Sequence, residues 1–102
     1  MTSAVPVAGT RRGMAEVRFT RHAVERYVDR VRCGWSVEEA EREISLIAGS
    51  GLISATAPAW SGVTGSMTLD LGDVCFVLAC GESDALVATT CLARGAHRRR
   101  HG

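Results

Sequence analysis

The chain has no lysine, only two prolines, an aromatic content of 5% and no long apolar run. No stretch approaches the roughly 20 apolar residues that a membrane-spanning helix needs, so we expect no membrane partner. Residues 1–13 lack the basic start and the unbroken apolar run of a signal peptide, and we therefore expect a cytoplasmic protein. A length of 102 residues allows one domain with a single modest core.

The four cysteines show neither a CxxC motif nor the Cys/His spacing of a zinc site. We therefore predict no metal and no cofactor. In a cytosolic protein such cysteines are expected to be free, half-buried thiols that behave as small hydrophobic side chains. A nucleophilic cysteine is the alternative.

Charge is segregated along the chain although the formal net charge is only +1. Residues 1–32 hold seven Arg against three acids, residues 33–93 hold one Arg against eight acids, and residues 94–102 hold four Arg and no acid. Basic ends around an acidic middle indicate a polyanionic partner. The exclusive use of Arg suits bidentate phosphate contacts, and a GC-rich genome is the alternative explanation for it.

Hydrophobic periodicity and capping signals predict two helices after a short strand. We interpret residues 1–15 as a flexible leader and residues 16–20 as the strand. Thr20 is a good N-cap for a helix that runs to Gly34, with valines and Tyr27 on its apolar side. The sequence SVEE (36–39) has the form of a capping box and starts a second helix that ends at residues 49–51.

The rest of the chain predicts strands at 52–57, 66–71, 74–80 and 85–93, with a two-residue turn at Gly72–Asp73 and a loop at 57–65. This order predicts an α+β domain over residues 16–94, in which two N-terminal helices pack on a four- to five-stranded, mainly antiparallel sheet with the order β-α-α-β-β-β-β. Residues 95–102 are expected to be a basic, disordered tail.

The stretch FTRHAVERYVDRVR (19–32) places His22, Arg26 and Arg30 in one column at intervals of four residues. Successive members lie about 6 Å apart along a helix axis, which approximates the spacing of successive phosphates on a strand. Histidine titrates near neutrality and is suited to acid–base work. The alternative is that the column is the ordinary polar side of an amphipathic helix, although like charges at this spacing cost a little stability.

A short strand, the sequence FTRHAVERY (19–27), a capped acidic helix and a meander that ends in VATT (87–90) together resemble the RelE-like toxins. More broadly, residues 16–93 resemble the barnase–EndoU–colicin–RelE (BECR) group of metal-independent ribonucleases. The nearest likeness is to small RelE-like domains of uncharacterised type with a "T-x-H-A-x-x-R" opening, an "S-x-E-E" second helix and a hydroxyl on the last strand.

This resemblance implies an endoribonuclease of the toxin type or an RNA-binding domain derived from one, which acts on RNA or at the ribosome and has an acidic antitoxin as partner. It implies three catalytic positions, His22, Arg26 and Thr89. The expected phosphate-binding residues are Arg30, Thr90 and Arg94, together with the tail residues Arg98, Arg99 and Arg100. The alternative function is a non-catalytic accessory module of a phage or mobile element, which binds a host protein or nucleic acid.

Overall fold

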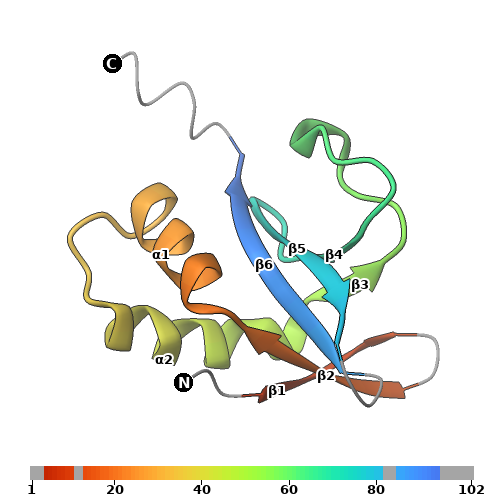
Figure 1. Ribbon diagram of the computed structural model, residues 1–102, viewed down its shortest axis with the longest axis horizontal. Helices are drawn as coiled ribbons and strands as arrows, with labels where there is room; N and C mark the ends of the chain where they lie inside the picture. The colour runs from red at the N-terminus through yellow and green to blue at the C-terminus, as the bar shows by residue number, and fades with distance from the viewer. Residues whose placement is uncertain (1–3, 11–12, 82–84, 95–102) are drawn as a thin grey trace.

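The computed structural model describes residues 4–10, 13–81 and 85–94, and the side chains of residues 16–81 and 85–94. Within these residues the chain forms two α-helices, two short 3-10 turns and six strands (Figure 1). In chain order they are β1 (Ala4–Thr10), β2 (Gly13–Phe19), α1 (Arg21–Arg30), α2 (Val37–Ile47), η1 (Ala48–Ser50), β3 (Leu52–Ser54), η2 (Ala59–Ser61), β4 (Met67–Asp70), β5 (Val74–Cys80) and β6 (Leu86–Ala93). Neither helix is long and apolar enough to cross a bilayer.

Both helices begin at the residues that the sequence predicts. The Thr20 hydroxyl accepts a hydrogen bond from the backbone amide of Ala23 at 3.1 Å, as an N-cap does. Ser36 and Glu39 form the reciprocal capping box, with distances of 3.0 and 3.2 Å. The helix α1 ends at Arg30, earlier than the expected Gly34, and the chain turns before α2.

The six strands form one curled, mixed sheet in the order β1-β2-β6-β5-β4-β3. Four neighbouring pairs are antiparallel, namely β1–β2, β3–β4, β4–β5 and β5–β6. The strands β2 and β6 run parallel to each other. The curl brings β1 against β3 at a single residue pair, Gly9 and Leu52. Because β2 pairs with β6, a strand near the start of the chain contacts the last strand directly.

The predicted α+β class with two helices is confirmed. The strand order differs from the prediction, and the sheet of the described residues combines four antiparallel pairs with two parallel ones. An additional strand, β1, lies in residues 4–10, where the sequence analysis expects a flexible leader, and β2 begins at Gly13. The pairing of β1 with β2 uses backbone groups, which leave no side-chain pattern in the sequence. The parallel β2–β6 pair joins segments some 70 residues apart, as Arg18 with Val87, and local periodicity carries no signal of it.

The strands after the helices lie close to their predicted positions. Strand β5 has the predicted bounds, and Gly72 has a φ of 98°, as the predicted turn before β5 requires. Strand β3 stops at Ser54, shorter than predicted, because residues 55–66 leave the sheet as a loop that contains η2. The predicted basic tail at 95–102 lies outside the described residues.

The two faces of the sheet have different covers. The inner face carries Phe76, Leu69 and Cys91, all fully buried in one core with both helices. The ring of Phe76 meets Phe19 edge-on at 4.8 Å and stacks with Tyr27 at 6.1 Å. The outer face carries the alternate residues, and Figure 1 shows the loop 55–66 beside it.

Candidate functional site: the junction of α1 and β6

The residue Thr20 ties the start of α1 to the last strand. Its backbone amide and its hydroxyl both donate to the Ala88 carbonyl, at 3.2 and 3.0 Å, while the same hydroxyl caps the helix. The β2–β6 pairing ends one residue earlier, at Phe19 and Ala88. The chain thus changes from strand to helix at the point where it contacts β6, and His22 and Thr89 are close in sequence to the two bonded residues.

A second hydrogen bond joins α1 to β6 further along the helix. Arg30 Nη1 donates to the Cys91 carbonyl at 3.4 Å, so its guanidinium reaches the backbone of β6. Because Thr20 contacts Ala88 and Arg30 contacts Cys91, α1 and β6 run in the same general direction. The predicted column starts at the exposed His22 and reaches the strand at the half-buried Arg30.

The middle member of the column, Arg26, pairs with Asp29 at 3.3 Å. Their side chains are 41% and 62% exposed, respectively. Exposed pairs of this kind contribute little free energy and exchange readily with other ligands. The Arg26 guanidinium is therefore accessible to an anion that competes with Asp29.

Thr89 occupies a β-bulge in β6. The register pairs Leu78 with Ala88 and Val77 with Thr90, so Thr89 is the extra residue. Its exposed side chain donates to the Val77 carbonyl at 3.3 Å. The bulge interrupts the regular alternation of side chains along β6. Bulges concentrate beside functional sites because they re-aim a side chain.

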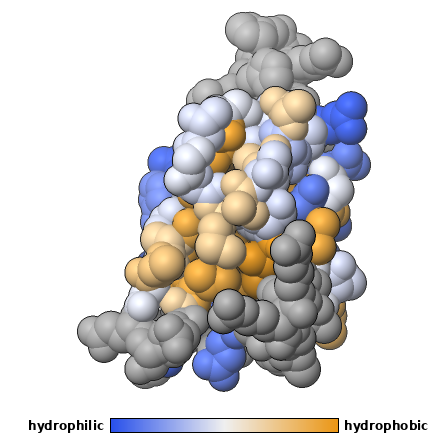
Figure 2. Space-filling model, turned by 90° about the vertical axis from the view of Figure 1, so that its right-hand side faces the viewer, coloured by the Kyte–Doolittle hydropathy of each residue, from blue (hydrophilic) through white to orange (hydrophobic). Residues whose placement is uncertain are grey.

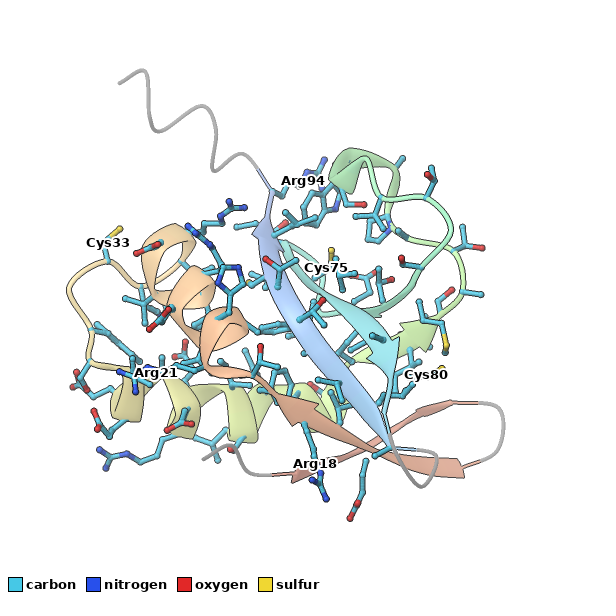
Figure 3. All side chains as sticks on the ribbon, viewed as in Figure 1. Arg18, Arg21, Cys33, Cys75, Cys80 and Arg94 are labelled. Carbon is cyan, nitrogen blue, oxygen red and sulfur yellow. The ribbon has the colours of Figure 1, made fainter. Side chains whose placement is uncertain are left out.

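The remaining predicted residues lie outside this junction or outside the described chain. Thr90 shares the outer face with Val77 and is half-buried. Figure 3 shows Arg94 at the end of β6 beside the loop with η2, and its backbone amide donates to the Asp73 carbonyl at 2.7 Å. In the described part, no hydrogen bond or ion pair joins the Arg94 side chain to the column. The predicted positions Arg98, Arg99 and Arg100 fall outside the described residues.

A polar cluster lies between the helices, and the sequence did not predict it. The buried Tyr27 hydroxyl donates to Glu43 Oε1, and Arg32 binds the same carboxylate through Nε at 2.9 Å and Nη2 at 3.3 Å. The guanidinium also lies 5.3 Å from the centre of the Trp35 ring. Hydrogen bonds from Arg32 and then Tyr27 lower the pKa of Glu43, whereas burial and then the bond to Glu43 raise the pKa of Tyr27.

This cluster connects α1, the turn after it and α2, so it fixes the helix that carries the column. The tyrosine is only 2% exposed, which confirms that it belongs to the core and leaves its ring inaccessible to a substrate. The i to i+16 spacing of Tyr27 and Glu43 explains why helical periodicity alone did not suggest the bond.

All four cysteines are free, as the sequence predicts, but none is half-buried: Cys75 and Cys91 are buried, whereas Cys33 and Cys80 are exposed. Burial raises the pKa of Cys75 to about 11 and that of Cys91 to about 12. A thiol acts as a nucleophile through its thiolate, so neither buried cysteine is suited to that role near neutral pH.

The described side chains contain no cluster of three or more His, Cys, Asp or Glu residues able to hold a metal ion. An open surface pocket lies at the far end of α2 and holds none of the predicted site residues; it is lined by Ile47, Ser50, Leu52, Asp70, Leu71 and Gly72. No protein-family model, curated protein or solved structure matches this chain.

Proposed function

We propose that the protein is a RelE-like, metal-independent endoribonuclease or an RNA-binding domain derived from one. The observation that supports this most is the junction of α1 and β6: Thr20, two residues before His22, bonds to Ala88, which precedes the bulged Thr89, and Arg30 of the column bonds to Cys91. A single strand of RNA offers phosphates at a spacing that fits such a column.

In the proposed reaction, the neutral His22 imidazole takes the proton of a ribose 2′-hydroxyl. The 2′-oxygen attacks the adjacent phosphorus, the bond from phosphorus to the 5′-oxygen breaks, and the imidazolium or water protonates the leaving oxygen. The products are a 2′,3′-cyclic phosphate and a 5′-hydroxyl. Arg26 and Arg30 stabilise the negative charge that develops on the phosphorane, and the Thr89 hydroxyl donates a supporting hydrogen bond.

The residues outside the junction have supporting parts in this proposal. Arg94, Thr90 and the arginines Arg98, Arg99 and Arg100 supply affinity for the flanking phosphates, which falls as the salt concentration rises. An acidic protein that covers the column would act as an inhibitor, as an antitoxin does.

The experiment is an in vitro cleavage assay with end-labelled RNA in the presence of EDTA. We expect cleavage that leaves 2′,3′-cyclic phosphate ends, with the rate reduced about 100-fold or more by His22→Ala, because a general base contributes roughly that much. Arg26→Ala and Arg30→Ala should lower the rate and weaken RNA binding. Arg42→Ala is the matched control, because it removes an exposed arginine from α2.

Full cleavage by a folded His22→Ala protein would contradict the proposed catalytic residue. The second candidate, a module that binds without cleaving, is favoured by the presence of only one histidine, His22, in the described part of the chain. It predicts RNA binding that depends on Arg26 and Arg30, and RNA that stays intact.

A further inference from the structure

The outer face of the sheet has a covered part and an uncovered part. Thr68 and Cys75 lie on this face and are fully buried. Figure 3 shows Cys75 toward the end of the strands where the loop 55–66 lies, and we attribute the cover to this loop. The loop does not extend over the opposite end of the strands, where β5 ends at the exposed Cys80.

The uncovered part is apolar. The strand register places Ala79 beside Val87, and Val77 follows on the same face. Ala79 is exposed and both valines are half-buried. Figure 2 shows apolar side chains gathered on this side of the molecule. We call Val77, Ala79 and Val87 the outer patch.

Two opposite charges border the outer patch on the neighbouring strand. Arg18 pairs with Val87 across the β2–β6 ladder, and Glu16 precedes it by two residues on the same face of β2. The two side chains are therefore about 6.6 Å apart along the strand. Both are exposed, and neither joins an ion pair among the side chains that the structure describes.

An apolar patch bordered by one acid and one base is complementary to a copy of itself. In a two-fold symmetric interface, residue i of one protomer meets residue j of the other, and j meets i. A rotation that stacks the two outer patches can place Glu16 of each protomer against Arg18 of its partner, which makes two ion pairs around an apolar centre. A partner of single charge would satisfy only one of the two groups.

We propose that the outer patch is the interface of a symmetric homodimer, with reciprocal Glu16–Arg18 pairs at its border. The surface lies on the face of the sheet opposite the helices, so the dimer leaves His22 and Arg26 on α1 open, whereas Thr90 lies beside Val77 on the dimer face. The inference does not depend on the proposed ribonuclease function, and either can fail alone.

The test is sedimentation equilibrium of the full chain over a range of concentrations up to millimolar. We expect a reversible monomer–dimer equilibrium. Val87→Glu should abolish the dimer, because it places a carboxylate in each apolar patch and draws its cross-strand neighbour Arg18 away from Glu16 of the partner. Leu46→Glu is the matched control and should leave the dimer unchanged, since Leu46 is 83% exposed on α2, away from the outer patch.

Charge exchange tests the symmetry. Glu16→Arg alone and Arg18→Glu alone each set like charges against each other at two places, so each should weaken the dimer about tenfold or more. The double variant exchanges both signs and should restore the dimer to within about threefold of the original dissociation constant. Circular dichroism checks that each variant is folded, as surface substitutions should allow.

Three results would overturn the proposal. These are a wild-type chain that stays monomeric at the highest concentration, a dimer that Val87→Glu leaves intact, and a double variant that dimerises no better than the two single ones.

Discussion

The contact of Tyr27 with Glu43 allows a quantitative test of what holds the helices together. The hydroxyl is on a side chain that is 2% exposed, and it donates to an ionised carboxylate. Replacing Glu43 by Ala leaves that hydroxyl buried without an acceptor, which costs about 1–3 kcal/mol of unfolding free energy. Replacing Tyr27 by Phe removes the hydroxyl itself, keeps the ring against Phe76, and costs about 1–2 kcal/mol.

The two substitutions should therefore not be additive. In a chain that already carries Tyr27→Phe, Glu43→Ala no longer leaves a buried hydroxyl without an acceptor. The loss of unfolding free energy caused by Glu43→Ala should therefore be smaller by about 1 kcal/mol or more. Urea denaturation of the four proteins measures this coupling. Glu41→Ala, on the same helix, is the control and should show no coupling to Tyr27. Equal costs of Glu43→Ala in both backgrounds would refute the hydrogen bond as the stabilising contact.

The same carboxylate sets a dependence on pH. The pKa of Glu43 is lowered in the folded protein from an ordinary value of 4.5, first by Arg32 and then by Tyr27. A lowered folded-state pKa means that the stabilisation is present above 4.5 and is lost as pH falls through the lower, folded value. The stability difference between wild type and Glu43→Gln should therefore shrink in acid. A difference that stays constant down to pH about 2 would contradict the assignment.

Three further substitutions or labelling experiments test individual contacts. Thr20→Val removes the helix cap and one tie to β6, and should cost about 1–2 kcal/mol in urea denaturation; no loss would argue against the cap. Gly51→Ala should cost about 1–3 kcal/mol, because the added Cβ would lie 2.5 Å from Cδ1 of the buried Leu69; an unchanged midpoint would show that the core yields there. With both exposed cysteines replaced by Ser, a thiol reagent should label Cys75 before Cys91, because a loop covers the first and two helices cover the second; equal rates would mean that the loop opens only with the whole fold.

Features that depend on neighbouring residues were predictable from the sequence. The N-cap Thr20 and the Ser36–Glu39 box follow from residues three apart. The bounds of β5 follow from an apolar run between two turns. The column on α1 likewise follows from helical spacing, and the structure places its last member, Arg30, against the backbone of β6.

Features that depend on distant pairing were not predictable. Strand β1 is held by backbone bonds to β2, and the parallel pairing of β2 with β6 joins the two ends of the domain. The bulge at Thr89 is a shift in the register between β5 and β6, which the sequence of β6 alone does not encode. The pairing of Glu43 with Tyr27 and Arg32 depends on how two helices cross, which no single periodicity encodes.

The two hydrogen bonds from Thr20 to Ala88 also determine when the junction can assemble. Contacts between residues far apart in sequence form late, because a long loop must close first. A growing chain that has not yet reached residue 88 holds the basic helix but lacks the strand that it docks on. The start of α1 and the last strand therefore come together only after nearly the whole domain has been synthesised.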